Sequence, residues 1–319
     1  MRPEQSSLIN LHLAVLLFGG TALFSKLISL SALDITVYRT AIAFITLACI
    51  LKFKGSVFKL RARKDYAIVI LLGVCVGLHW VTYFAAMQMA GIAVGVIAFF
   101  TYPVITVLLE PLFFKSNIKR KDIFTAAVVI CGIYLLVPNS DPGNQITLGI
   151  ITGVFSGALF ALRNLLQKKL FSSYGGPHTM FYQTLIAGLM LCAFVEVPPS
   201  DLSTENLFLI VLAGCVFTAI PHALFASCLR YLSATTAGLI SCLQPLYATV
   251  LAYMLLAETI TLTTLAGAYW LSVQPAMRRG RSQGISYDPG FCTPRCQWKL
   301  PRKLAQRHSG STGSGRRRH

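Results

Sequence analysis

The chain has 319 residues, of which 55% are hydrophobic and 12% are charged, and its mean hydropathy is +0.65. A soluble globular domain carries roughly 25% charged residues, so this composition excludes a protein with water on all sides and predicts a polytopic membrane protein. The formal net charge is +17, but residues 276–319 hold eleven Lys and Arg against the single Asp288, so the excess does not indicate nucleic-acid binding.

Ten hydrophobic segments follow one another along the chain, and most approach the ~20 residues that cross a bilayer as a helix. The fifth and the tenth are short. We therefore expect an all-α polytopic membrane protein with ten transmembrane helices. The segments cover residues 8–30, 34–51, 66–87, 92–114, 123–137, 148–166, 177–197, 206–226, 235–257 and 260–275.

The connections between these segments alternate in charge. The even-numbered connections carry Lys and Arg, most densely between residues 52 and 64, whereas the odd-numbered connections carry Asp and Glu without Lys or Arg. Basic loops stay on the cytoplasmic side of a membrane. The pattern predicts that both termini are cytoplasmic, in the plasma membrane (the inner membrane of a bacterium).

Short sequence matches link spans one, two and four to the spans five places later. Residues 38–43 (YRTAIA) match residues 182–187 (YQTLIA) at four of six positions, and Ala-Leu-Phe occurs at both 22–24 and 158–160. Pro103 and Pro245 stand at corresponding places in spans four and nine. We expect two five-helix repeats, residues 1–137 and 138–275, and because five is odd the second repeat should be inverted.

Inverted repeats of this kind place a substrate site near the membrane midplane, at the repeat interface. A proline within a helix removes one backbone hydrogen bond and leaves a carbonyl free. We expect Pro103 and Pro245 to break or kink spans four and nine beside a cavity, because irregular backbone at membrane depth is tolerated where it lines one.

Over residues 8–273 the sequence resembles the EamA branch of the drug/metabolite transporter superfamily. The resemblance rests on Phe18-Gly19-Gly20 in the first span, Arg39 at the start of the second, the two proline segments, and Ala257-Glu258 followed by Gly267-Ala268. The sequence departs from the family's Gly-Glu pair after the proline helix, with Ala257-Glu258 in the second half and Lys115-Ser116 in the first.

Members of that family are ten-helix carriers of amino acids, nucleobases and other small metabolites. The resemblance therefore implies a secondary transporter of amino-acid-like or amphipathic solutes that works by alternating access, which we expect to be an exporter.

Polar side chains inside the spans identify candidate substrate-binding residues, because such groups are costly in lipid and face the bundle interior or a cavity. A cavity built from them would offer aromatic faces and hydrogen bonds with little fixed charge. The alternative is that the Trp and Tyr side chains belong to an interfacial belt or to helix packing, and that the His side chains are simply packed. The candidates are His79, Trp80, Tyr83, Tyr102, His222, Gln244 and Tyr247; Gln88 is a further polar residue on span three.

Other residues have expected structural or coupling roles. Arg39 is expected to be structural, as are Pro103, Pro245 and Glu258. Arg39 and Lys26 lie near the outer ends of their spans and could snorkel to the interface, or Arg39 could bind a backbone carbonyl.

Glu110 has two open interpretations. It is the acidic residue placed well inside a span, which makes it the candidate for proton coupling. The alternative is an interfacial ion pair with Lys115.

Motifs of other function classes have no support in the hydrophobic segments. The sequence contains no HExxH and no paired intramembrane aspartates, and its match to GxSxG, residues 280–284 (GRSQG), lies in the basic tail, which argues against an enzyme. It contains no P-loop, which argues against an ATP-driven pump. Seven of the nine cysteines lie in apolar segments, and Cys292 and Cys296 have no second pair, so neither a metal site, a cofactor nor a disulfide framework is expected.

The expected partners are a small-molecule substrate and membrane lipid, with a homodimer as an open alternative. Two other functional interpretations remain open: a non-transporting receptor or assembly factor, and a carrier with reduced activity through C-terminal damage.

The segment 276–319 differs in character from the spans before it. It is rich in Arg, Ser, Gly and Pro, and span ten loses its last turn and a half to Pro275 and to Arg278 and Arg279. Such a segment cannot bury enough apolar surface to fold, so we expect a disordered basic tail. It is either an arm attracted to anionic lipid or the product of a frameshift or cloning scar.

Overall fold

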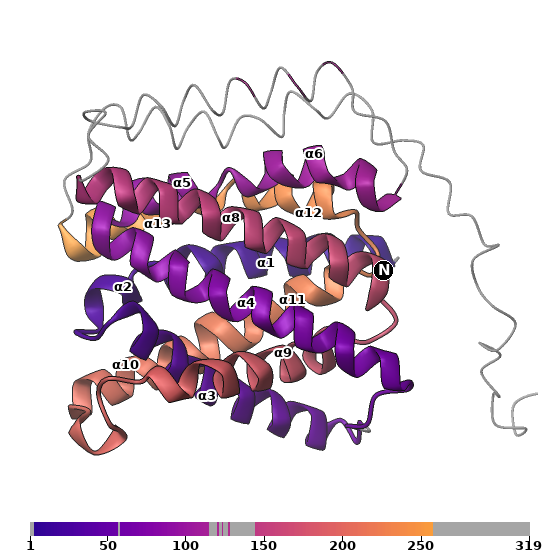
Figure 1. The fold of residues 1–319 in the computed structure, drawn as a ribbon, viewed down its shortest axis with the longest axis horizontal. Helices are drawn as coiled ribbons and strands as arrows, with labels where there is room; N and C mark the ends of the chain where they lie inside the picture. Colours follow the sequence, from indigo (N-terminus) through magenta and orange to yellow (C-terminus); the bar gives the residue numbers. More distant parts are fainter. Residues whose placement is uncertain are drawn as a thin grey trace, which may run out of the picture. The chain divides into compact units, whose positions relative to one another are not determined.

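The structure is a computed structural model that describes residues 3–56, 58–114 and 144–257, together with the isolated residues 120, 123 and 127. Within these ranges the chain is helical and contains no β-strand (Figure 1). The expected tenth span, the tail 276–319, Lys115 and Glu258 lie outside the described residues, as does almost all of the expected fifth span.

The helices up to residue 114 correspond to the first four expected spans. They are α1 (Pro3–Thr21), α2 (Phe24–Leu27), α3 (Ala32–Phe53), α4 (Arg63–Ala90), α5 (Ile92–Phe99) and α6 (Tyr102–Phe114).

The helices from residue 145 onward correspond to expected spans six to nine. They are α8 (Gln145–Leu170), α9 (Gly176–Leu191), α10 (Thr204–Gly214), a π-helical turn (Cys215–Ala219), α11 (Ile220–Cys228), α12 (Ala234–Ser241) and α13 (Gln244–Leu256), with short 3-10 turns at Cys192–Phe194 and Pro199–Asp201.

Among the described residues, six helical stretches are long and apolar enough to cross a membrane. They are Gln5–Leu27, Ala32–Phe53, Arg63–Ala90, Ile92–Phe114, Gln145–Leu170 and Thr204–Cys228. The helix of expected span seven ends at Leu191 rather than at residue 197. Two consecutive prolines, Pro198 and Pro199, follow closely, and the residue before a proline is disfavoured in the helical conformation.

Spans four and nine are interrupted, as their prolines predict. The helix stops at Phe100 and Thr101 between α5 and α6, and at Cys242 and Leu243 between α12 and α13. In each case α-helix resumes within three residues, and the proline lies in the first turn of the new helix, where its missing N–H costs no intrahelical bond.

Two further interruptions are not marked by the paired prolines. Between α1 and α2 the helix loosens after Gly19 and Gly20, and the π-helical turn lies just before Pro221. Pro221 cannot donate to the carbonyl of Phe217. The hydroxyl of Thr21, at the end of α1, donates to that carbonyl instead at 2.9 Å, so the two irregular segments are bonded to each other.

Glycines allow α8 to pack closely along α4, α5 and α6 (Figure 1). Gly149, Gly153 and Gly157 recur every four residues on one face of α8, and a Cβ atom at any of them would come within 2.6–2.8 Å of α4, α5 or the residues that follow it. Small residues at this spacing let backbones approach in membrane helices. The packing fixes α8 against the interruption of span four.

Candidate functional site

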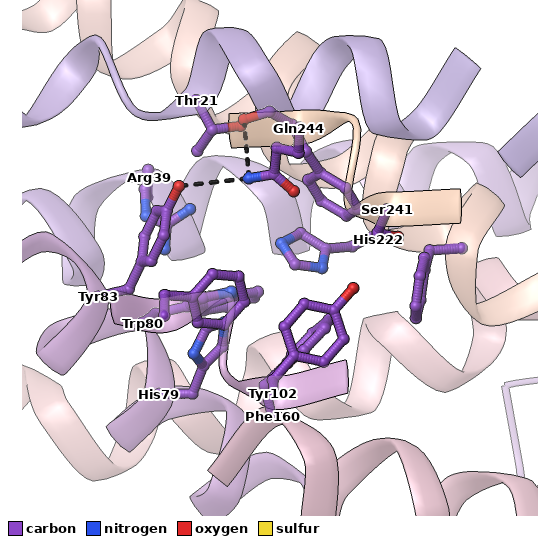
Figure 2. A pocket seen from close by; sticks show the side chains of 13 residues that line it. Thr21, Arg39, His79, Trp80, Tyr83, Tyr102, Phe160, His222, Ser241 and Gln244 are labelled. Atoms are coloured by element: carbon purple, nitrogen blue, oxygen red, sulfur yellow. Dashed lines mark hydrogen bonds between the residues drawn. The ribbon is translucent and has the colours of Figure 1, made fainter. Parts of the chain in front are cut away.

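A cavity lies where the interrupted helices meet (Figure 2). It holds about 410 Å³ of space between atoms, part of which is open to solvent. Its 13 lining residues come from α1, α3, α4, α5, α6, α8, α11, α12 and α13. They are Phe18, Thr21, Arg39, His79, Trp80, Tyr83, Phe99, Tyr102, Phe160, His222, Phe225, Ser241 and Gln244.

Residues that flank the helix interruptions supply much of this lining. Thr21 is the last residue of α1, Phe99 and Tyr102 stand on either side of the α5–α6 interruption, and Ser241 and Gln244 on either side of the α12–α13 interruption. A helix end leaves backbone groups without intrahelical partners. Three interruptions therefore deliver polar backbone and side chains to one place.

Gln244 connects three of the helices around the cavity. Its amide Nε2 lies 3.4 Å from the carbonyl oxygen of Phe18 on α1 and 3.4 Å from the hydroxyl of Tyr83 on α4, and donates to both. Figure 2 shows both hydrogen bonds along one side of the cavity. The side chain holds the start of α13 against α1 and α4.

Arg39 enters the cavity from α3, and its side chain is 1% exposed. The guanidinium carbon lies 4.7 Å from the ring centre of Trp80 and 4.6 Å from that of Phe84. Nη1 donates to Thr218 Oγ1 at 3.0 Å, whereas Nε and Nη2 have no hydrogen-bond partner among the described residues. The snorkelling interpretation is wrong for Arg39, because the side chain is buried, and among the described residues the guanidinium binds no backbone carbonyl.

The two histidines are buried in different surroundings. His79 Nδ1 lies 2.8 Å from Ser156 Oγ on α8, and its ring stacks on Phe99 with 5.2 Å between centroids. The His222 ring meets Trp80 edge-on at 5.0 Å. Within the described part of the chain, His222 Nδ1 and Trp80 Nε1 have no hydrogen-bond partner, so unpaired polar atoms cluster around Arg39.

The structure brings six of the seven predicted substrate-binding residues to the cavity: His79, Trp80, Tyr83, Tyr102, His222 and Gln244. Trp80 and Tyr83 are 1% and 5% exposed, so the interfacial-belt interpretation is wrong for both. Tyr247 does not line the cavity. Its side chain is partly exposed, and its Cβ packs against Gly19 of α1, where an added Cβ would approach to 2.6 Å.

The remaining polar candidates lie away from the cavity. Glu110, the proton-coupling candidate, is not among the lining residues of the cavity. It is partly buried on α6, and its charge interacts with Lys168 on α8. Gln88 Nε2 donates to the carbonyl of Leu30 at 2.9 Å and ties α4 to the loop after α2. Lys26 is exposed, as the snorkelling interpretation requires.

Sequence reasoning missed six lining residues besides Arg39. Phe residues in apolar segments carry no signal that separates a cavity from a core. Phe99 and Ser241 could have been found from the sequence, because each stands four residues before one of the paired prolines, Pro103 and Pro245. In a continuous helix the backbone carbonyl of each would accept a hydrogen bond from that later residue, and a proline has no N–H to donate. The missed residues are Phe18, Thr21, Phe99, Phe160, Phe225 and Ser241.

A second buried arginine, Arg163 of α8, does not line the cavity. All three of its nitrogens have acceptors: Gln183 Oε1 at 2.8 Å, Asn164 Oδ1 at 2.9 Å and Met180 Sδ at 2.8 Å. Gln183 and Met180 belong to α9, so the cluster fastens α8 to α9. Among the described residues, no group of three or more His, Cys, Asp or Glu side chains could hold a metal ion.

The model of the EamA-like transporter family matches residues 5–137 and 147–271. A relative from Archaeoglobus fulgidus described as an uncharacterized transporter is 27% identical over 259 residues, covering 80% of this chain and 89% of the relative. One from Vibrio cholerae with the same description is 23% identical, covering 75% and 80%.

A solved structure titled "Crystal structure of protein" shares the fold with a TM-score of 0.64 and 15% identity. It covers 85% of this chain and 96% of the solved one.

Proposed function

The chain belongs to the EamA-like transporter family, and we propose that it exports small amino-acid-like or amphipathic metabolites across the plasma membrane as a secondary carrier with alternating access. The observation that carries this proposal is the cavity, because five of its 13 lining residues flank three helix interruptions. Transporters commonly build their substrate site from discontinuous helices of this kind.

The proposed architecture is ten spans in two inverted repeats, residues 1–137 and 138–275, with both termini cytoplasmic. The family model matches in two separate segments of similar length, which supports a duplication. The paired interruptions of spans four and nine, and the alternation of charge between connections, support it independently.

Alternating access defines what transport requires. The cavity has to open to each side of the membrane in turn, so the helices around it have to move. The interruptions are the natural hinges, because backbone without regular intrahelical bonds absorbs changes in dihedral angle at low cost. We propose that α5 and α6, and α12 and α13, tilt about their junctions to open the cavity to alternate sides.

The experiment compares transport with abundance. Purified protein in proteoliposomes is assayed for counterflow of a labelled panel of amino acids and organic acids. Trp80→Ala should reduce counterflow per protein molecule at least tenfold, because it removes a lining ring that contacts both Arg39 and His222.

The matched control is Phe181→Ala, which removes another ring of the same hydrophobic cluster without touching the cavity. This change should lower the yield of folded protein more than the activity of each molecule. Equal specific activities of Trp80→Ala and wild type would contradict the assignment of the cavity as the transport site.

A further inference from the structure

We infer that Arg39 binds a carboxylate of the transported solute, so the cavity selects monoanions with an apolar or aromatic body. This inference rests on the proposed function and narrows its substrate class. It changes the sequence-based expectation of a cavity with little fixed charge, because a buried guanidinium stands in the lining.

The first support is the contrast between the two buried arginines. Arg39 and Arg163 are 1% and 0% exposed. Arg163, which fastens two helices, has an acceptor for each of its nitrogens. Among the described residues, Arg39 has one acceptor, Thr218 Oγ1, and its Nε and Nη2 have none. The arginine that fastens two helices is fully paired, and the cavity arginine lacks partners within the part of the chain that the structure describes.

The second support is energetic. Burying an ion is unfavourable unless it is paired and hydrogen-bonded. The rings of Trp80 and Phe84 offset part of this penalty through cation–π contact, but they do not replace the hydrogen bonds that Nε and Nη2 lack among the described residues, which leaves a deficit. A carboxylate would remove this deficit, because its two oxygens match the guanidinium fork.

The third support is the chemistry of the neighbouring unpaired groups. Trp80 Nε1 is without a partner among the described residues, and an indole N–H can only donate. A guanidinium likewise only donates. Two donor-only groups in contact call for a ligand that accepts several hydrogen bonds. The unpaired His222 Nδ1, on a ring 5.0 Å from that of Trp80, can complete the set as a donor in the appropriate tautomer.

The other lining residues indicate the charge and polarity of the part of the ligand that lies away from its carboxylate. None of the 13 lining residues is Asp or Glu, so nothing there offers a counter-charge to an amine. Phe99, Tyr102 and Phe160 present ring faces and edges within 5.5 Å of one another. An apolar or aromatic body fits these rings, and a second charge does not.

The test uses four probes of related shape on the purified full-length protein in detergent. Phenylacetate carries the ring and the carboxylate, phenylacetamide is its neutral counterpart, phenethylamine is the cation, and acetate lacks the ring. Titration calorimetry should show phenylacetate binding about tenfold or more tightly than each of the others, the worth of a charge-assisted hydrogen-bond pair.

Variants identify the residue responsible. Arg39→Gln should abolish the preference of phenylacetate over phenylacetamide, and Arg39→Lys should retain it in part, because Lys keeps the charge without the fork. Arg163→Gln is the matched control, since it removes a buried charge away from the cavity and should retain the preference.

The inference is overturned if wild-type protein binds phenylacetamide as well as phenylacetate, binds acetate as well as phenylacetate, or binds none of the probes. It is also overturned if Arg39→Gln keeps the preference. The wild-type comparison stands even where a variant does not fold. Wild-type protein that lacks the charge preference but still catalyses counterflow refutes this inference alone, whereas Trp80→Ala with intact counterflow refutes the proposed transport site.

Discussion

Two glycines on neighbouring helices differ in the space around them. A Cβ atom at Gly157 of α8 would lie 2.6 Å from the carbonyl oxygen of Phe99 and 3.3 Å from the amide nitrogen of Tyr102, the two residues that flank the interruption of span four. A Cβ atom at Gly188 of α9 would meet only Thr40 Cγ2, at 3.8 Å. Backbone atoms cannot move aside as a flexible side chain can, so the two sites should respond differently to the same substitution.

Gly157→Ala should destabilise the protein by about 1–3 kcal/mol, the usual cost of overpacking. Gly188→Ala should be neutral or stabilising by about 0.5–1 kcal/mol, because Ala restricts the unfolded chain. The measurement is the thermal midpoint of each purified variant in the same detergent. Similar thermal midpoints for the two variants would show that α8 does not pack tightly against the interruption of span four.

Arg39 illustrates where prediction from single residues stops. Its position near the start of span two indicates an arginine within reach of the interface, and the sequence does not reveal that Trp80 and Phe84 of α4 enclose the guanidinium. The lining residues of α4 were predictable, because polar side chains in an apolar span point inward. Which helix lies opposite depends on packing, and packing cannot be read from one sequence.

Helix interruptions were predictable where a proline marks them and not elsewhere. Pro103 and Pro245 indicate the interruptions of spans four and nine to within three residues. The interruption between α1 and α2 has no proline. It follows Gly19 and Gly20, each of which weakens a helix by about 0.5–1 kcal/mol relative to Ala, and its exact place depends on the bond from Thr21 to Phe217.

Side-chain hydrogen bonds also join the connections between helices, and Tyr174 is an example. It lies between α8 and α9, donates to Asp65 Oδ2 at 2.6 Å and accepts from the backbone N–H of Arg61 at 2.7 Å. Burial, followed by the hydrogen bond to Asp65, raises the pKa of Tyr174 above its ordinary value of 10.0. Two loops far apart in the sequence are thereby joined through one phenol.

Tyr174→Phe should lower stability by about 1–3 kcal/mol near neutral pH, because Asp65 and the Arg61 amide lose a partner. The folded-state pKa is raised, so the stabilisation from the protonated phenol is complete below the unfolded-state pKa and is lost as the pH rises through the folded-state value. The difference in thermal midpoint between wild type and variant should therefore be full at about pH 8 and smaller at about pH 11.

Tyr231→Phe serves as the control for this pH series, because the Tyr231 side chain is half exposed. Its midpoint should follow that of wild type at every pH. A difference for Tyr174→Phe that stays constant across the series would contradict the coupling between this phenol and folding.

For the molecule as a whole, the proposed topology predicts on which side of the membrane each connection lies. Fusions of a side-specific reporter at Asn144, before α8, and at Lys168, near its end, should report opposite sides of the membrane, with Asn144 outside. The reason is the basic character of the connection that follows α8, which the positive-inside rule places in the cytoplasm. The same side for both fusions would refute the ten-span arrangement.

The helical class and the positions of most spans were predictable, because hydrophobic segments of membrane length are nearly sufficient to define membrane helices. The meeting of α5 with α6 and of α12 with α13 at one cavity was predictable only through the inferred repeat. The contributions of α1 and α8 were not predictable, since Phe18 and Phe160 resemble any other residue of an apolar span.

The aromatic lining of the cavity has an electrical consequence. A file of water molecules conducts protons across a membrane, and a lining in which Phe, Tyr and Trp rings predominate gives such a file few hydrogen-bond partners. A cell membrane stores about 2.3 kcal/mol for each elementary charge per 100 mV, and a cavity lined in this way disfavours the leak of that energy through the binding site.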